Sequence, residues 1–297
     1  MERRNPVFGA ILSVPGMAWL AVFFVVPGYV VLAISFGGID PIFRSPLPAW
    51  NPADWSFEQF SFVFGHLVGP DGFLGPTLLR TLVFAGVAIV LCILISFPVA
   101  YFVARHAGRR RGLILALLLA PFWISYMMRM LAWVNLLQAD GLVNKALSLG
   151  GVFSVQVDWL AGRASTVVLG LVYGYVPYMI LPLYAALDRI SPSVIEAARD
   201  LGAGRVDTFR RVVLPMSRPG IAAGIILIGL PMFGDYFSND LLSNSPQTAM
   251  LGNLINLSIG TPGQAGQAGA LVVLLTLLLL VPMVLYVRSS NRGDVRS

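Results

Sequence analysis

Charged side chains are scarce in this sequence. They make up 11% of its 297 residues, whereas hydrophobic residues make up 57%. A typical soluble domain has about 25% charged residues, and a water-soluble fold of this length could not bury so much apolar surface. The composition therefore excludes a soluble protein. It predicts an all-α integral membrane protein, because helices satisfy their own backbone hydrogen bonds in lipid.

Lysine, histidine and cysteine are nearly absent, and each absence excludes a kind of chemistry. Lys145 is the single lysine, and the sequence has no G-x-x-x-x-G-K-[ST] loop to cradle nucleotide phosphates. His66 and His106 lie far apart, with no cluster of cysteine or carboxylate residues around either. Cys92 has no second cysteine to form a disulfide within the chain. We therefore expect neither an enzyme nor a metal site, and any ATP chemistry must belong to another subunit.

Six apolar segments are candidates for membrane spans. A hydrocarbon core about 30 Å thick needs roughly 20 apolar residues in a helix. Five segments meet this requirement, and the remaining one is short in its uncharged part. The first segment is too long for the apolar core of a cleaved signal peptide, so we expect it to be retained. The predicted spans, in a single transmembrane domain covering 1–297, are 10–36, 81–104, 113–137, 164–187, 219–237 and 268–287.

Arginine is distributed unevenly over the loops between these spans. If the N-terminus is cytoplasmic, fifteen of the twenty Lys and Arg residues lie on the cytoplasmic side. The positive-inside rule predicts this asymmetry, so we expect six transmembrane helices with both termini cytoplasmic. The net charge of +6 follows from this topology. We therefore expect membrane lipid, and no nucleic acid, around the basic residues.

The longest predicted cytoplasmic loop, 188–218, has the pattern of two short amphipathic helices. Ser193 and Glu196 have the spacing of a capping box at the start of the first helix. The second helix is predicted at 205–212, ending at Leu214-Pro215. Such helices could dock into a cleft of another protein or lie on lipid headgroups, and the pattern alone favours neither alternative.

The residues of this loop resemble a known motif, the EAA loop of ABC importer permeases. The family usually has isoleucine where this chain has Val212, but the spacing is otherwise kept by Glu196-Ala197-Ala198, Gly202, Val212 and Leu214-Pro215. The resemblance implies a type I ABC importer permease fold in a bacterial inner membrane. It also implies that the first loop helix is a coupling helix, with Glu196 as its charged contact and Gly202 as the turn after it.

The same resemblance implies partners and cofactors outside this chain. In that family one six-helix chain forms half of a translocation path, so we expect a second permease subunit, most simply a distinct chain. We also expect two ATP-binding subunits, which would hold ATP and Mg, and an extracytoplasmic substrate-binding protein. No cofactor is expected on this chain itself.

A further resemblance concerns the cargo. The third span and the region after the fifth are similar to the spermidine/putrescine class of permeases in Pro121-Phe122-Trp123, Ser125, Arg129, Ala132, Trp133, Gly141, Asn144, Gly234-Asp235-Tyr236 and Asp240-Leu241-Leu242. That class often has proline at the position of Asn239, and Gly-Gly at Ser243-Asn244, so the match is incomplete. It implies a polyamine cargo. The alternatives are an amino-acid-derived solute, a phosphonate or an oxyanion.

Two ionisable residues, Arg129 and Asp235, lie within or beside predicted spans. At 1.5 Å per residue of straight helix, both would lie in the outer half of the membrane, where charged side chains normally face a partner or a water-filled cavity. We expect them to pair across the bundle or to line the translocation path; alternatively, each reaches the outer interface without a role. For a cationic cargo, Asp235, Asp240, Tyr236 and Trp133 would supply charge and cation–π contacts. An unpaired Arg129 facing the path would favour an anion.

Two other classes of function fit the sequence less well. A transporter driven by an ion gradient, without an ATPase, is expected to have several carboxylates within the membrane or a repeated pore motif, and neither is present. A structural or signalling subunit is expected to have a sizeable soluble domain, which the sequence lacks. The importer permease is therefore the favoured interpretation.

Overall fold

The computed structural model of the chain describes residues 6–68, 72–149 and 157–294. Two compact units make up the chain. One comprises Met1–Gly75 with Leu254–Leu278, and the other Pro76–Asn253 with Leu279–Ser297. The helices α13 (Leu251–Gly260) and α14 (Ala265–Asp294) contribute residues to both units.

The first unit begins with a long, largely exposed helix and continues into a folded loop. Its elements are α1 (Pro6–Leu20), the π-helical turn η1 (Ala21–Val25), α2 (Val26–Ser35), the antiparallel strands β1 (Gly38–Ile39) and β2 (Pro46–Leu47), the 3₁₀ turn η2 (Pro52–Asp54) and α3 (Glu58–Val68). Phe36 is central to this unit, because its ring stacks on Trp55 at 4.3 Å and contacts Phe60 at 4.6 Å between ring centroids. Val63, Ala270 and other buried residues complete this small core.

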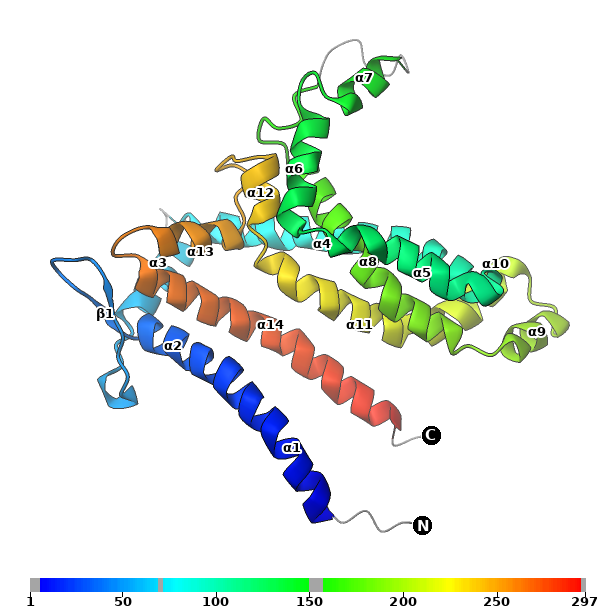
Figure 1. Ribbon diagram of the computed structural model, residues 1–297, viewed down its shortest axis with the longest axis horizontal. Coiled ribbons are helices and arrows are strands. Elements are labelled where there is room, and N and C mark those ends of the chain that lie inside the picture. The colour runs from blue at the N-terminus through cyan, green and yellow to red at the C-terminus, as the bar shows by residue number, and fades with distance from the viewer. Residues whose placement is uncertain (1–5, 69–71, 150–156, 295–297) are drawn as a thin grey trace. The chain divides into compact units, whose positions relative to one another are not determined.

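The second unit contains the remaining helices (Figure 1). They are α4 (Leu74–His106), η3 (Gly108–Arg110), α5 (Arg111–Leu119), η4 (Ala120–Trp123), α6 (Tyr126–Leu137), α7 (Leu142–Leu149), α8 (Ala164–Asp188), α9 (Pro192–Asp200), α10 (Arg205–Thr208), η5 (Phe209–Val213), α11 (Leu214–Phe233) and α12 (Phe237–Leu242).

Hydropathy and helix length together give the membrane spans. Within the described residues, five helices are long and apolar enough to cross a membrane, namely Ser13–Ser35, Leu74–His106, Ala164–Asp188, Arg205–Phe233 and Ala265–Tyr286. A sixth crossing results if Gly108–Trp123 and Tyr126–Ser148 count as one broken span. The all-α fold with five to six apolar spans agrees with the prediction.

The segment predicted as a straight third span, 113–137, is broken in its middle. The helices on the two sides of the break meet at 83°, and Figure 1 shows α6 turning away from α5. Pro121 lies within the 3₁₀ turn η4, and Ile124 and Ser125 are extended. A proline removes a backbone donor, and its ring clashes with the carbonyl four residues earlier, so the α-helix gives way to a 3₁₀ turn here. The depth expected for Arg129 assumed a straight helix, and this assumption is wrong.

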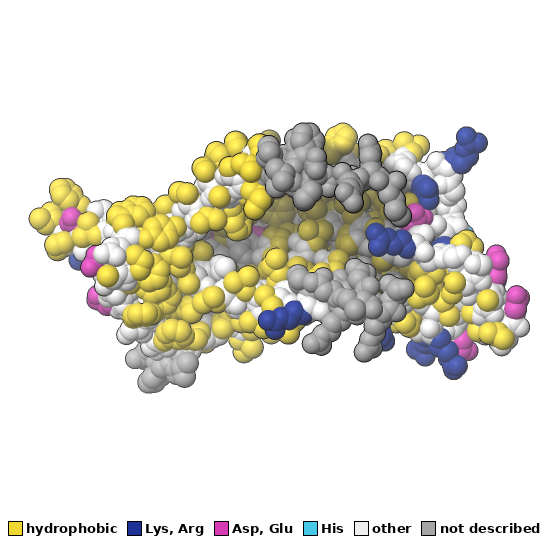
Figure 2. Space-filling view, turned by 90° about the horizontal axis from the view of Figure 1, so that it is seen from below, with side chains coloured by type: hydrophobic (Ala, Val, Ile, Leu, Met, Phe, Trp, Pro, Cys, Tyr) yellow, Lys and Arg dark blue, Asp and Glu magenta, His cyan; other side chains and the backbone are white. Residues whose placement is uncertain are grey.

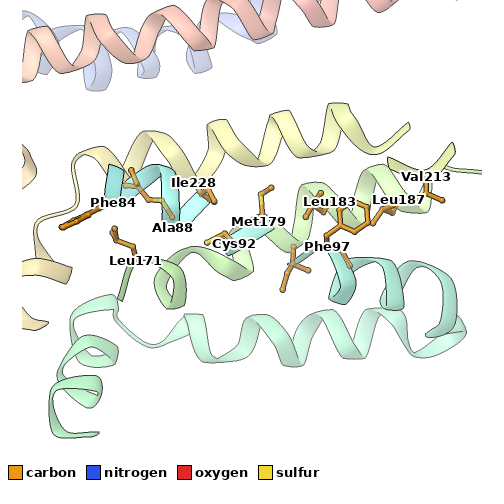
Figure 3. Packing of buried hydrophobic residues seen from close by; sticks show 14 of the residues in the cluster. Phe84, Ala88, Cys92, Phe97, Leu171, Met179, Leu183, Leu187, Val213 and Ile228 are labelled. Atoms are coloured by element: carbon orange, nitrogen blue, oxygen red, sulfur yellow. The ribbon is translucent and has the colours of Figure 1, made fainter. Parts of the chain in front are cut away.

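The packing of α8 against α11 forms the main core of the second unit. Gly220 and Gly224 are spaced as a G-x-x-x-G pair on α11, and a Cβ atom at either position would overlap Ala186 or Met179 of α8. Small residues at this spacing let two membrane helices approach closely. Figure 3 shows the apolar side chains of α4, α8 and α11 meeting in this core.

Polar contacts hold α4 to α8 within the same core. Ser96 Oγ donates a hydrogen bond to the Val176 carbonyl oxygen at 3.0 Å, and Arg105 Nη2 donates to the Leu187 carbonyl oxygen at 3.0 Å. Hydrogen bonds between helices in lipid contribute about 0.6 kcal/mol on average. They therefore fix which faces of the two helices meet more than they stabilise the pair.

The fifth span is longer than predicted and begins in the loop. Residues 205–233 form one helical rod, which passes through Pro215 without ending. The turn before this proline is the π-helical η5, in which the Leu214 N–H donates to the Phe209 carbonyl oxygen five residues earlier. A proline ring clashes with the carbonyl four residues before it, and the wider turn relieves that clash. The predicted helix end at Leu214-Pro215 is therefore wrong.

Candidate functional site

The loop between α8 and α11 carries the first group of predicted site residues. Helix α9 is capped by Ser191, whose hydroxyl oxygen accepts a hydrogen bond from the Ser193 N–H at 3.3 Å. The cap is therefore Ser191, two residues before the predicted Ser193, because Pro192 fits the first helical position, where no N–H is needed. Glu196 and Ala197 are exposed on this helix, and Ala198 is half-buried.

Gly202 ends α9 in a left-handed turn. Its φ is +86°, its N–H donates to the Arg199 carbonyl oxygen at 2.8 Å, and the Ala203 N–H donates to the Ala198 carbonyl oxygen at 3.0 Å. This pair of bonds is the Schellman motif, which strongly favours glycine at the left-handed position. The chain therefore reverses at Gly202 and enters α10, as the resemblance to the EAA loop implied.

The apolar residues of α9 have two different environments. Ile195 is buried in the core formed by α4, α8 and α11. Leu201, at the end of the helix, is 89% exposed. Leu214 and Pro215 follow η5 directly and are the first two residues of α11. Ile195 thus packs the loop against α4, α8 and α11, whereas the Leu201 side chain is free to contact another molecule.

Arg129, on α6, is buried among aromatic rings. The side chain is 6% exposed, and its guanidinium carbon lies 4.2 Å from the centre of the Phe122 ring and 5.4 Å from that of Tyr126. Tyr173 contributes a third ring at 5.9 Å. The Nε and Nη1 atoms of Arg129 are buried and have no hydrogen-bond partner among the described residues. The charge is therefore balanced by ring faces and not by a carboxylate.

Asp235 lies between α11 and α12 and is 7% exposed. Its carboxylate accepts hydrogen bonds from the hydroxyl groups of Tyr126 at 2.7 Å, Tyr175 at 3.3 Å and Ser238 at 3.1 Å. The Ser238 N–H donates to its other oxygen at 3.0 Å. Four donors therefore hold this carboxylate in a fixed position.

Arg129 and Asp235 share Tyr126 instead of forming an ion pair. No salt bridge joins them within the described part of the chain, so the expected direct pairing is not observed. The Tyr126 ring lies under Arg129 while its hydroxyl binds Asp235. Both charges are buried, so neither extends to an interface. The sequence analysis did not predict Tyr126 as a site residue, although it lies three residues before Arg129 and thus on the same helix face.

The other predicted path residues belong to neighbouring contacts. Trp133 packs edge-on against Tyr173 at 5.3 Å, which places it in the aromatic cluster around Arg129. Asp240 instead accepts a hydrogen bond from Asn253 Nδ2 at 2.6 Å, and the same amide donates to the Tyr236 carbonyl oxygen at 3.0 Å. The structure thus forms one group around Arg129 and Asp235 and another around Asn253.

A cavity of about 880 Å³ borders two of these rings. Phe122 and Tyr173 line it, together with apolar side chains of α4 and α8 such as Val87 and Val172. Its walls offer almost no polar group, so it suits an acyl chain better than a polar solute. Neither Arg129 nor Asp235 is among the residues that line this cavity.

The described residues thus combine apolar helices long enough to cross a membrane with a helix–turn–helix loop between α8 and α11. Residues 96–292 match the family of binding-protein-dependent transport system inner membrane components. The chain therefore belongs to this family. It is the permease subunit of an ABC importer, a multi-pass protein of the inner membrane, and not an enzyme; the ATPase is a separate subunit.

Curated relatives support this assignment over most of the chain. The chain is 30% identical over 258 residues to the spermidine/putrescine transport system permease protein PotB of Salmonella typhimurium (strain SL1344), covering 86% of this chain and 84% of the relative. The PotB of Haemophilus influenzae is 32% identical over 255 residues, with the same coverage of both chains. The inner membrane ABC transporter permease protein YdcU of Escherichia coli is 34% identical over 197 residues, covering 63% and 62%.

Solved structures support the type I permease fold. A chain of a bacterial alginate ABC transporter, in complex with an alginate pentasaccharide-bound periplasmic protein, matches with a TM-score of 0.72 and 18% identity, over 98% of this chain and 96% of the other. A chain of the MetNI methionine ABC transporter, in an inward-facing conformation, matches with a TM-score of 0.52 and 17% identity, over 79% and 98%. At these identities the likeness concerns the fold alone.

Proposed function

We propose that this permease imports a polyamine such as spermidine or putrescine. The observation that carries the proposal is a buried carboxylate, Asp235, which accepts hydrogen bonds from the hydroxyl groups of Tyr126 and Tyr175, with the Phe237 ring beside that of Tyr126. A carboxylate beside aromatic faces suits ammonium groups through charge and cation–π attraction. Relatives at about 30% identity that are named as spermidine/putrescine permeases support the same cargo.

Arg129 is the observation that favours a second candidate cargo, an anionic solute such as an oxyanion or an amino-acid-derived acid. Its guanidinium has two buried N–H donors without partners among the described residues. Guanidinium groups bind carboxylate and phosphate oxygens in a bidentate manner. In the observed arrangement, however, these donors are enclosed by rings and face no polar cavity, so the polyamine remains the first proposal.

Uptake measurements distinguish the two cargoes. Cells that lack the gene and are complemented with the wild-type chain should accumulate labelled spermidine, and the Asp235→Asn variant should lower the initial rate about tenfold or more. The loss of one hydrogen bond to a charged group costs about 1.5–3 kcal/mol. Asp140→Asn, which neutralises an exposed carboxylate outside the cluster, is the matched control. Wild-type cells that accumulate no polyamine, but do accumulate an anion in a manner that depends on Arg129, would overturn the proposal.

We further propose that α9 is the coupling helix that docks on an ATP-binding subunit. The exposed side chains of Glu196 and Leu201 offer a charge and an apolar tip for a groove of that subunit. Two such subunits, each with ATP and Mg, would close against each other. This closure would move the loops of this chain and of a second permease chain toward each other. The spans would then move as one transmembrane unit and open toward a loaded extracytoplasmic binding protein.

This scheme requires α9 to face the cytoplasm, together with both termini. Cys92 is buried, so a background with Cys92→Ala allows single cysteines to be placed at will. Ala203→Cys should react with a membrane-impermeant maleimide only after the cells are permeabilised. Ala53→Cys, in the loop after β2, should react in intact cells. The opposite pattern would reject both the topology and the coupling role of α9.

A further inference from the structure

A second cavity, of about 470 Å³, lies where the end of α4 meets α9 and α10. Three basic side chains from three helices line it, namely His106, Arg199 and Arg205. Figure 2 shows basic and acidic side chains gathered at the end of the molecule where Figure 1 places α9 and α10. The cavity thus brings His106 of α4 together with two arginines of the loop that lie more than 90 residues later in the sequence.

No carboxylate lines this cavity within the described residues. Of the acids in this loop, Asp188 binds Arg111 at 3.1 Å and Asp207 binds Arg211 at 3.3 Å. Glu196 and Asp200, which lie beside Arg199 on α9, do not line the cavity and form no ion pair in the described part of the chain. Arg199 and Arg205 form no ion pair in the described part of the chain. The positive charge of the cavity is therefore available to an anion from outside the chain.

The remaining walls of the cavity are of mixed character. Tyr101 adds an aromatic side chain, whose ring centroid lies 6.3 Å from that of His106. Phe209 and Val213, on η5, form an apolar side. α4 ends at His106, at the limit of a candidate span. A polar, basic opening beside an apolar wall at the end of a span fits a group that lies at the membrane surface.

We propose that this cavity binds a phosphate group, supplied as the headgroup of an anionic phospholipid. Arginine binds phosphate oxygens through several parallel N–H donors, and basic pockets between membrane helices on the cytoplasmic side hold anionic headgroups. Because Arg199 lies on α9 and His106 on α4, one bound phosphate bridges the coupling loop and the bundle. The inference goes beyond the proposed cargo, and its test requires no transport.

Lipid binding to the purified importer, in detergent with all its subunits, tests this site by native mass spectrometry. Phosphatidylglycerol is the probe, and phosphatidylcholine is the zwitterionic control. The double variant Arg199→Gln/Arg205→Gln should bind phosphatidylglycerol about 25-fold more weakly than the wild type, because each arginine near an anionic lipid contributes roughly a factor of five. Binding of phosphatidylcholine should not change.

A matched double variant separates a built site from general attraction. Arg210→Gln/Arg218→Gln removes the same charge from exposed positions of the same loop that do not line the cavity. It should keep most of the phosphatidylglycerol binding. Equal losses in both double variants would overturn the proposal, since diffuse attraction would then explain the binding.

Inorganic phosphate distinguishes the lipid from a soluble source. If the headgroup occupies the cavity, inorganic phosphate should displace phosphatidylglycerol from the wild type and from the control variant. If inorganic phosphate binds in a manner that depends on Arg199 and Arg205 while phosphatidylglycerol binding is the same in all variants, the lipid assignment is wrong. Equal binding of both probes by all variants rejects the site altogether.

Discussion

The Tyr126 hydroxyl and the Asp235 carboxylate lie 2.7 Å apart and join α6 to the connection between α11 and α12. Because α6 follows the break in the third span, this bond links the displaced half of that span to the end of the fifth. The Tyr126 ring also lies under Arg129. One side chain thus positions both buried charges.

Tyr126→Phe tests the hydroxyl separately from the ring. The variant should be destabilised by about 1–3 kcal/mol, because a hydrogen bond to a buried charged group is lost, while the contact with Arg129 remains. Cys92 is buried, so a thiol-reactive fluorescent dye reports unfolding of the purified chain during heating. Tyr178→Phe removes a more exposed hydroxyl of α8 and should leave the melting temperature unchanged. Equal melting temperatures for wild type and Tyr126→Phe would show that this bond contributes nothing.

Gly174→Ala tests the space in which Tyr126 sits. A Cβ atom at this position would lie 2.6 Å from Tyr126 Cε2 and 3.0 Å from its hydroxyl oxygen. The ring must shift, which we expect to cost about 1–3 kcal/mol and to lower uptake together with stability. Gly86→Ala, in α4, meets no atom within 4 Å and should be neutral or slightly stabilising. A Gly174→Ala variant that melts at the wild-type temperature would contradict the close packing.

Gly202→Ala tests the turn after the proposed coupling helix. The position has a φ of +86° with open space around it, so the effect comes from backbone strain alone, about 1–2 kcal/mol. We expect a lower yield of copurified ATP-binding subunit, or ATP hydrolysis that is no longer stimulated by cargo. Gly204→Ala also has open space but an ordinary φ of −66°, and should behave like the wild type. Identical results for the two variants would rule out a role for the turn.

Arg129→Leu tests whether a costly residue is kept for function. Each buried unsatisfied donor costs about 1–3 kcal/mol, and the contacts with aromatic rings return about 0.5–2 kcal/mol. The variant should therefore be as stable as the wild type or more so, while uptake is lost. The melting temperature is measured on the purified variant, and uptake is measured in the cells that express the same variant. Full uptake by the variant would assign Arg129 no part in transport.

The sequence predicted what hydropathy and local motifs determine. Apolar length located the spans, and the left-handed turn that ends α9 followed from Gly202 in its motif. The break of the third span was missed because Pro121 resembles the prolines that other spans tolerate, such as Pro98 within α4. Whether a proline bends or breaks a helix depends on its neighbours in space.

The contacts of the buried charges could not be predicted for a similar reason. Opposite charges at similar depth suggested an ion pair, but the direction of α6 after the break decides which groups meet. Tyr175 lies on α8, 60 residues from Asp235, so its bond to the carboxylate leaves no pattern in a single sequence. Only the spacing of Tyr126 and Arg129 on one helix face was available in advance.

The π-helical turn η5 contains one residue more than an α-helical turn, within the helical rod that runs from Arg205 to Phe233. Side chains after it are rotated by roughly 100° relative to those of an uninterrupted helix. The side chains before η5 and those after it therefore follow two different helical registers. Substitutions can change the direction of the exposed Arg205 side chain while Gly220 and Gly224 stay in register with α8. Loss of Pro215 would remove the reason for the wide turn and bring the two phases back together.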